Sequence, residues 1–217
     1  MRIGITGDTH GSAQAIRRIL QQTPPIELWL HTGDYAADAN RLHDATGIKT
    51  VRVRGNCDLL DDGSKFDEYL EIEGYKIWLT HGHRYIERNV QADLGYWAKQ
   101  LGQDIVVFGH THVPLAEYYA ETLLVNPGSP SRPRGGSEPC FAVLTLQAGQ
   151  TPQAKLCAAA QAGGVIRQPD GPESLCTEQC DQQPGHQLAL AAQQRGLCDA
   201  GRRPAHAYGS QCAHHQA

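Results

Sequence analysis

The first quarter of the chain alternates short apolar runs with segments of helical spacing. Three apolar-rich runs of strand length are separated by two segments with helical periodicity, in the order 2–6, 12–22, 26–30, 37–46 and 50–53. In the first helical segment Ile16, Ile19 and Leu20 fall on one side. Ser12 stands where it can cap the helix. Strands and helices that alternate with short connections predict a parallel sheet flanked by helices.

The middle of the chain changes to strand patterns. Residues 69–80, YLEIEGYKIWLT, alternate apolar and polar positions on both sides of Glu73 and Gly74, which predicts a hairpin within 66–80. A helix is expected over 90–101. Four more short strands are expected at 105–108, 116–119, 123–126 and 141–146. Two packed sheets with helices outside are the simplest arrangement that buries all these faces, so we expect an α/β protein.

The apolar pattern stops near residue 150. The stretch 151–217 holds seven residues of the Val, Ile, Leu, Met and Phe types and one aromatic, Tyr208, too little apolar surface to offset the entropy of ordering it. We expect a folded domain over 1–150 and a low-complexity, disordered C-terminal tail over 151–217. Cys176 and Cys180 could suggest zinc, but their spacing matches no compact zinc module. An odd total of seven cysteines also argues against a disulfide framework.

Composition excludes several classes of partner. The formal net charge is −4, the isoelectric point is about 6.2, and no stretch concentrates Lys and Arg, so a long nucleic acid is not expected as a partner. No run approaches the roughly 18 apolar residues that span a membrane, and the opening MRIGITGDTHG has too short an apolar run for a signal peptide. We therefore expect a cytoplasmic protein with no membrane partner. The oligomeric state stays open, a homo-oligomer included.

Five of the expected strands end in polar residues beside glycine. The five motifs are GDTH (7–10), TGD (32–34), RGNCD (54–58), THGH (80–83) and GHTH (109–112). The carboxyl ends of parallel strands gather along one edge of an α/β sheet, where ligands bind. Taken singly, Asp and Asn at such positions are usually turn formers, and a lone His is usually a satisfied structural residue. Five strand ends with oxygen and nitrogen donors together predict a shared metal site.

These motifs, in this order and at these spacings, resemble the calcineurin-like metallophosphoesterase superfamily. VRGNCD, VFGHTHVP and VNPGS are especially similar to its small bacterial and archaeal phosphodiesterase branch. The resemblance covers residues 1 to about 148 and implies a four-layer αββα sandwich of two mixed β-sheets flanked by helices, with two metal ions at one edge. The implied ligands of one ion are Asp8, His10, Asp34 and His112. Those of the other are Asp34, Asn56, His81 and His110, with Asp34 bridging both.

Two divalent ions at such a site supply the chemistry of phosphate ester hydrolysis. They lower the pKa of a bridging water, orient the hydroxide for in-line attack on phosphorus and stabilise charge on the phosphoryl oxygens. Ligation by His, Asn and carboxylate without thiolate suits several ions. We expect Mn²⁺, with Zn²⁺, Fe²⁺, Ni²⁺ or Co²⁺ as alternatives.

Three residues are expected to assist catalysis. Asn56 acts at the metal centre, His83 either approaches the substrate or supports His81, and Asp58 either orients a metal ligand or begins a turn. Cys57 stands where many superfamily members carry a histidine directly after the metal-binding asparagine. Because a neutral thiol is only a weak donor, general-acid help from this position is in doubt.

The expected function is that of a binuclear metal-dependent phosphodiesterase for small, nucleotide-like phosphodiesters. Two alternatives are a phosphomonoesterase or dinucleoside-polyphosphate hydrolase, and a non-catalytic interaction scaffold on the same fold. In the loop 126–136, NPGSPSRPRGG, Arg132 and Arg134 either reach a substrate phosphate or belong to a solvated connection. Neither a phosphate-binding glycine loop nor a dinucleotide fingerprint is present, so nucleotide-cofactor chemistry is not indicated.

Overall fold

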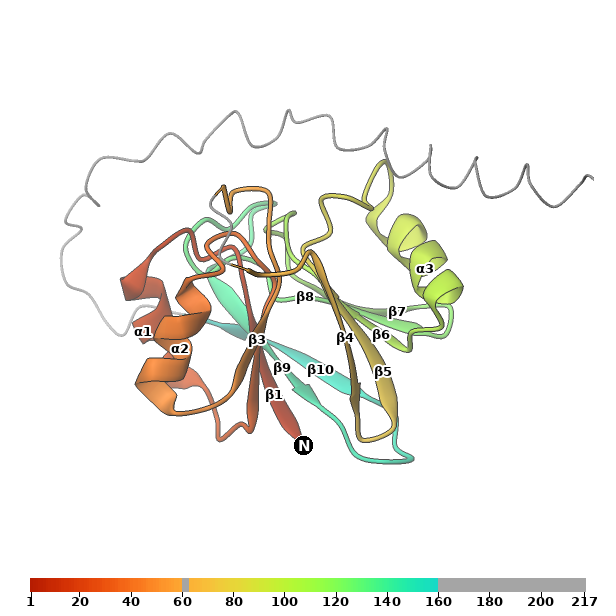
Figure 1. Cartoon of the computed structure of the whole chain (residues 1–217), viewed down its shortest axis with the longest axis horizontal. Helices are drawn as coiled ribbons and strands as arrows, with labels where there is room; N and C mark the ends of the chain where they lie inside the picture. Colours follow the sequence, from red (N-terminus) through yellow and green to blue (C-terminus); the bar gives the residue numbers. More distant parts are fainter. Residues whose placement is uncertain (60–62, 160–217) are drawn as a thin grey trace, which may run out of the picture. The chain divides into compact units, whose positions relative to one another are not determined.

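The computed structural model describes residues 1–59 and 63–159. In this part, two five-stranded sheets face each other and three helices cover their outer sides (Figure 1). None of the helices described is long and apolar enough to cross a membrane. The disorder expected for the tail, and the cysteines assigned to it beyond Cys157, lie outside the described residues.

The first sheet has the strand order β10-β9-β1-β2-β3. Its strands are β1 (Arg2–Thr6), β2 (Leu28–His31), β3 (Thr50–Arg52), β9 (Cys140–Thr145) and β10 (Gln153–Ala158). Strands β1, β2 and β3 are parallel, as expected, whereas β9 runs antiparallel to β1 and β10. Helices α1 (Ala13–Gln22) and α2 (Asp38–Thr46) connect the parallel strands. The predicted cap is confirmed, because Ser12 Oγ accepts the N–H of Ala15 at 3.2 Å.

The second sheet has the order β4-β5-β6-β8-β7. Its strands are β4 (Asp67–Ile72), β5 (Tyr75–Thr80), β6 (Ile105–Val107), β7 (Leu115–Tyr119) and β8 (Thr122–Asn126). The predicted hairpin is confirmed as β4 and β5, with left-handed backbone at Glu73 (φ 53°) and Gly74 (φ 82°). Helix α3 (Val90–Leu101) precedes β6 and ends at Gly102, which is also left-handed.

Alternation along the strands separates the apolar residues into three layers. The layer between the sheets includes Ile3, Ile5, Leu30, Ile77, Leu79, Val107 and Val125. On the outer face of the first sheet, Trp29 packs in one cluster with Leu42 of α2. On the outer face of the second sheet, Trp78 packs in one cluster with Leu94 of α3. The expected four-layer αββα sandwich is confirmed (Figure 1).

Strand β10 lies beyond the boundary expected at residue 150. It pairs with β9 in antiparallel register from Gln153 opposite Thr145 to Ala158 opposite Cys140. Its side chains are exposed or half-buried, because it forms an edge of the sheet. An edge strand is held by backbone hydrogen bonds on one side and needs few apolar residues. Apolar content therefore underestimates how far the sheet extends.

Candidate metal centre

The polar strand ends meet at one edge of the sandwich. In the first sheet, the turn after β1 lies beside the turn after β2, where Asp8 N–H donates to Gly33 O at 2.9 Å. In the second sheet, the turn after β6 lies beside the end of β5, where Gly109 N–H donates to His81 O at 3.1 Å. The two sheets are joined at this edge, since His110 N–H donates to Asp8 Oδ2 at 3.1 Å.

Four of the expected ligands form a first cluster. Donor atoms of Asp8, His10, Asp34 and His112 lie within 4.8 Å of one another. His112 Nε2 lies 3.2 Å from His10 Nε2 and 3.3 Å from Asp8 Oδ1. His10 Nε2 lies 3.9 Å from Asp34 Oδ2. Imidazole and carboxylate donors around one point suit a divalent transition-metal ion.

The remaining expected ligands form a second cluster that shares Asp34 with the first. His81 Nε2 lies 2.9 Å from Asn56 Oδ1 and 3.4 Å from Asp34 Oδ1. His110 Nδ1 lies 3.1 Å from Asn56 Oδ1. Asp34 thus turns Oδ2 toward His10 and Oδ1 toward His81. All seven residues that the resemblance implies as ligands therefore lie in two adjoining clusters.

Hydrogen bonds on the far side of two imidazole rings determine which nitrogen faces the centre. His81 Nδ1 lies 2.8 Å from Thr32 O, and His112 Nδ1 lies 2.7 Å from Arg132 O. Because a carbonyl can only accept, each Nδ1 carries a proton, and each Nε2 of a neutral ring presents a lone pair to the centre. The lone pair of His81 then faces the acceptor oxygen of Asn56. A cation between such acceptors removes their mutual repulsion.

One buried polar atom also indicates that the first cluster is suited to a cation. Within residues 1–59 and 63–159, Asp8 Oδ1, which lies 3.3 Å from His112 Nε2, has no hydrogen-bond partner. An unpaired buried polar atom costs about 1–3 kcal/mol. The donor set contains carboxylate, imidazole and amide oxygen, which suits Mn, Fe, Zn, Co or Ni. The residues present therefore fit a divalent metal centre.

The local electrostatics favour the cation-binding forms of Asp34 and His10, and they favour a positive charge at His81. Burial raises the pKa of Asp34, but His81 and the N–H of Cys57 outweigh it and hold the pKa at about 2. Burial lowers the pKa of His10 to about 4, against the nearby carboxylates. Burial also opposes a charge on His81, but the carboxylates exceed this effect and raise its pKa. The positive charge favoured at this point is the charge that a metal ion would supply.

The backbone is left-handed at most of the expected ligands. In the described part of the chain, eight non-glycine residues have positive φ. Five of them are Asp8 (49°), His10 (46°), Asp34 (55°), His110 (68°) and His112 (58°). Such conformations cost about 1–3 kcal/mol each and persist where the surrounding structure imposes them, typically at functional sites.

Glycines in two of the motifs allow the turns to approach closely. A Cβ on Gly109 would lie 2.7 Å from Asp8 Oδ2, and a Cβ on Gly55 would lie 2.5 Å from Asp34 N. Both distances are far below contact distance. Glycine is needed at these two positions because the turn that carries each carboxylate fills the space of a side chain.

Comparison with known proteins identifies the family. The model of the calcineurin-like phosphoesterase superfamily domain matches residues 1–149. The chain belongs to this superfamily. The match covers most of the chain and contains both clusters, so the resemblance seen in the motifs is confirmed.

Individual relatives are similar over most of their own length. The probable metallophosphoesterase YsnB of Bacillus subtilis is 34% identical over 149 residues, which cover 68% of this chain and 85% of the relative. The phosphodiesterase YfcE of Escherichia coli is 32% identical over 174 aligned residues, covering 66% of this chain and 87% of the relative.

Solved structures share the fold. A predicted phosphoesterase of Streptococcus pneumoniae matches with a TM-score of 0.61 and 26% identity, over 73% of this chain and 89% of that chain. Vps29 of Entamoeba histolytica, in complex with zinc, matches with a TM-score of 0.60 and 23% identity, over 74% and 100%. At that identity the second likeness concerns the fold alone.

Asp58 orients the turns that carry two expected ligands. Its Oδ1 accepts the N–H of Ala36 and its Oδ2 accepts the N–H of Gly55, both at 2.8 Å. Ala36 lies just after Asp34, and Gly55 lies just before Asn56. Of the two roles expected for Asp58, these contacts favour the orientation of ligands.

Cys57 contacts the shared carboxylate. Its backbone N–H donates to Asp34 Oδ1 at 2.8 Å, and its thiol also hydrogen-bonds to this carboxylate. The amide nitrogen of Asn56 lies 3.8 Å from Cys57 Sγ, which leaves Asn56 Oδ1 directed at His81. Cys57 therefore positions both residues, and nothing in these contacts makes it a proton donor for a leaving group.

His83 lies beside the second cluster. Its ring centroid is 5.2 Å from that of His81 and 6.1 Å from that of His110. Burial, together with these two rings, lowers the pKa of His83 to about 3. His83 Nδ1 is buried and has no hydrogen-bond partner in the described residues. The ring is thus neutral at neutral pH and retains a polar atom for another partner.

The loop after β8 has a role that sequence reasoning missed. Ser129 Oγ donates to Asp8 O at 2.8 Å and accepts the N–H of Arg132 at the same distance. Ser131 Oγ donates to Asp8 O at 3.1 Å. The carbonyl of Arg132 holds His112, as described above. The VNPGS motif could have indicated this role. It contributed to the family resemblance, but no role was assigned to its serine.

A buried hydrogen-bond chain beneath the ligands was also missed. Gly33 N–H donates to His31 Nδ1 at 3.2 Å, so His31 Nε2 carries the proton and faces Thr9 Oγ1 at 3.3 Å. Thr9 Oγ1 donates to Asp38 Oδ2 at 2.6 Å, which also accepts the N–H of Gly11 at 3.1 Å. The chain links the TGD turn to the GDTH turn. Asp38 lies in the first turn of α2, where the sequence gives no sign of such a contact.

Proposed function

We propose that the chain is a binuclear metal-dependent phosphodiesterase that hydrolyses small, nucleotide-like phosphodiesters. The observation that carries the proposal is the orientation of Asp34, which turns one carboxylate oxygen toward each of two donor clusters. The name of the E. coli relative, a phosphodiesterase, supports the substrate class.

The ligands of one ion would be Asp8, His10, Asp34 and His112, and those of the other Asp34, Asn56, His81 and His110. Bound there, two divalent ions, Mn²⁺ in the first instance, would acidify a water, direct it at phosphorus and neutralise charge on the phosphoryl oxygens. The protein's own groups prepare the ligands. The carbonyls of Thr32 and Arg132 keep a nitrogen lone pair of His81 and His112 directed inward.

Two residues near the second cluster, His83 and Cys57, are candidates to protonate the leaving group. His83 is neutral at neutral pH, because its pKa is lowered to about 3 by burial and by the His81 and His110 rings. We therefore expect His83 to hydrogen-bond a substrate oxygen and not to deliver a proton as an imidazolium ion. Cys57 is engaged with Asp34. Bound metal ions would then have to stabilise the departing oxygen of a nucleotide-like diester.

A substrate panel tests the proposal. The full-length chain is loaded in turn with Mn²⁺, Zn²⁺, Fe²⁺, Co²⁺ or Ni²⁺ and assayed with bis-p-nitrophenyl phosphate, p-nitrophenyl phosphate and a dinucleoside polyphosphate. We expect the diester to be hydrolysed with the highest kcat/KM. A higher value for the monoester or the polyphosphate would replace the proposed substrate class. No turnover with any ion would contradict the proposal and favour the interaction scaffold.

A further inference from the structure

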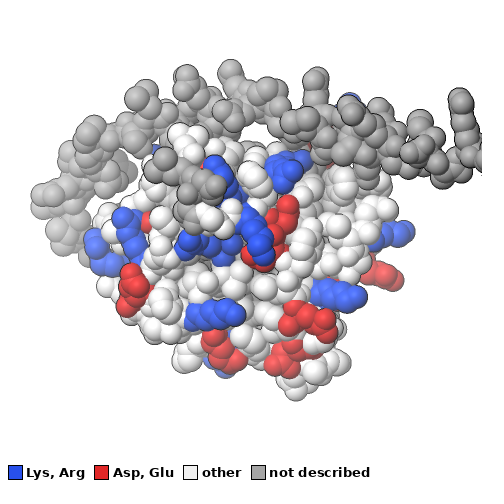
Figure 2. Space-filling view, viewed as in Figure 1, with Lys and Arg blue, Asp and Glu red and all other residues white. Residues whose placement is uncertain are grey.

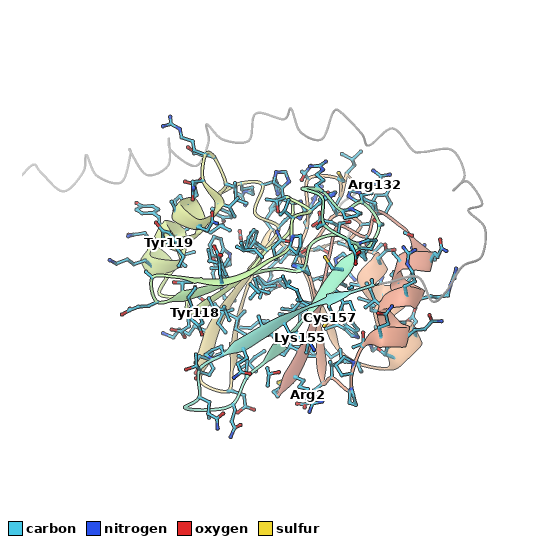
Figure 3. The ribbon with its side chains drawn as sticks, turned by 180° about the vertical axis from the view of Figure 1, so that it is seen from behind. Arg2, Tyr118, Tyr119, Arg132, Lys155 and Cys157 are labelled. Atoms are coloured by element: carbon cyan, nitrogen blue, oxygen red, sulfur yellow. The ribbon has the colours of Figure 1, made fainter. Side chains whose placement is uncertain are left out.

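Arg132, in the loop after β8, accepts a hydrogen bond from the expected ligand His112 through its backbone carbonyl. Figure 3 shows Arg132 at the end of the molecule opposite Arg2, which begins β1. That end is where the parallel strands finish and where the two clusters lie. The face drawn in Figure 2 has basic side chains gathered in its upper part, toward the same end, and acidic side chains mainly in its lower part.

The backbone of Arg132 is fixed to the first cluster on both sides. Its N–H donates to Ser129 Oγ, which in turn donates to Asp8 O. Its carbonyl accepts the Nδ1–H of His112 at 2.7 Å. Arg18 holds the same loop, because its Nη2 donates to Pro130 O at 3.2 Å. The position from which the Arg132 side chain starts is therefore set by the same contacts that orient the ligands.

The guanidinium of Arg132 differs from those of other arginines around the site. Arg41 pairs with Asp38, and Arg54 Nε donates to Asp58 O at 2.9 Å. By contrast, no described residue accepts a hydrogen bond from the half-buried Arg132 side chain or forms an ion pair with it.

A guanidinium in this position is suited to binding an anion. The positive charge of two divalent ions would exceed the negative charge of the two carboxylates, Asp8 and Asp34. Arg132 would therefore face an excess of positive charge. An anionic group between Arg132 and the cluster would remove this repulsion. The planar fork of arginine matches two oxygens of a phosphoryl group, and such charge-assisted hydrogen bonds are strong.

We propose that Arg132 binds a non-bridging phosphoryl oxygen of the substrate at the rim of the first cluster. This inference rests on the proposed function only for the presence of the metal ions. It assigns to one side chain the recognition of the anionic phosphate. It also separates Arg132 from Arg134, which is exposed and whose backbone N–H donates to His112 O at 3.2 Å.

The test measures binding of inorganic phosphate to the full-length, Mn²⁺-loaded chain by titration calorimetry. We expect Arg132→Gln to weaken phosphate binding about 10- to 100-fold, because a hydrogen bond to a charged group is lost. Arg132→Lys, which keeps the charge without the fork, should lie between this variant and the wild type. Arg134→Gln is the matched control in the same loop and should bind phosphate within about twofold of the wild type.

Three results would overturn the inference. They are unchanged phosphate affinity in Arg132→Gln, equal weakening in Arg134→Gln, and loss of bound Mn²⁺ from Arg132→Gln and Arg132→Lys, which would place the side chain among the supports of the ligands. Metal content is measured for each variant, and thermal unfolding verifies that it is folded. If Arg132→Gln does not fold, Arg132→Lys decides, and affinity equal to that of the wild type counts against the inference.

Failure of this inference is distinguishable from failure of the proposed function. Diester turnover by the wild type tests the function, and phosphate affinity of the variants tests Arg132. A chain that binds phosphate through Arg132 but hydrolyses no ester would retain the inference and contradict the function. If the wild type hydrolyses the diester but Arg132→Gln leaves phosphate affinity and KM unchanged, the proposed function stands and the inference about Arg132 is wrong.

Discussion

The layer between the two sheets and the edge where the strand ends meet differ in what they bury. Between the sheets the buried side chains are aliphatic, as at Ile77 and Val125. At the edge, Asp8 and His81 are fully buried and Asp34 is 2% exposed. Removing apolar surface from water stabilises the fold by about 25 cal/mol per Å². Burying charged groups costs free energy unless they are paired or bind a metal.

The two regions therefore contribute differently to the protein. The aliphatic layer holds the sheets in register, and this register brings the strand ends together. The edge combines buried carboxylates with left-handed backbone, both of which lower stability. We expect substitutions between the sheets to change the free energy of unfolding and substitutions at the edge to change metal binding and activity.

The largest effect is expected for Asp34→Asn at the edge. The substitution removes the charge of the carboxylate that faces both clusters. Loss of several kcal/mol of transition-state stabilisation corresponds to a fall in kcat/KM of at least about 1,000-fold. The fall in kcat/KM is measured from turnover of bis-p-nitrophenyl phosphate at saturating Mn²⁺, and thermal unfolding verifies that the variant is folded.

Asp44→Asn is the matched control for this change. Asp44 is an exposed carboxylate on α2, so the same chemical substitution should leave turnover within about twofold. If Asp34→Asn retained turnover within about tenfold of the wild type, the shared role of its carboxylate would be wrong.

Ile77→Ala, between the sheets, is expected to lower stability and to leave activity unchanged. Ile77 is fully buried and pairs with Ile105 across the parallel strands β5 and β6. The cavity left by the substitution should lower the free energy of unfolding by about 2–5 kcal/mol, measured by urea titration, while kcat of the folded protein stays near that of the wild type. Lys76→Ala, an exposed neighbour on β5, should change stability by less than about 0.5 kcal/mol. A drop in kcat without a drop in stability would erase the distinction between the two regions.

A smaller effect is expected for Ser129→Ala, which lies where the two regions adjoin. The substitution removes the hydroxyl that links Asp8 O to Arg132 N–H. Partners of this kind typically contribute about 10- to 100-fold to metal affinity or activity. We expect the lower value, about tenfold, in Mn²⁺ affinity measured by calorimetry. Ser137→Ala removes a hydrogen bond to Arg134 O in the same loop and should leave Mn²⁺ affinity unchanged. Equal effects of the two variants would show that general loosening of the loop is responsible.

The sequence predicted the aliphatic layers and the convergence of the edge because both leave local patterns. Period-two alternation locates the β4–β5 hairpin, and donors beside glycine mark the ends of five strands. The supports of the edge leave no such pattern. Asp38 reaches Thr9 across 29 positions, and Ser129 reaches Asp8 across 121. A single polar residue in a helix or a loop shows no long-range partner until the topology is known. Strand β10 escaped notice for a related reason, since its partner is the backbone of β9.

The smallest effect is expected for truncation after Ala159, which removes only residues outside the described part. The composition of that stretch offers little apolar surface, so we expect stability and diester turnover to stay within about 1 kcal/mol and about twofold of the full-length values.

Truncation after Gln150 is the contrasting variant. It removes β10 and leaves the buried strand β9 as an edge, with Phe141 and Leu144 no longer covered from that side. We expect this shorter chain to lose at least about 2 kcal/mol in urea titration, because apolar surface and one row of backbone hydrogen bonds become exposed. Equal stability of the two truncations would place the end of the folded domain at residue 150 after all, and loss of turnover on truncation after Ala159 would assign the C-terminal stretch a part in the site.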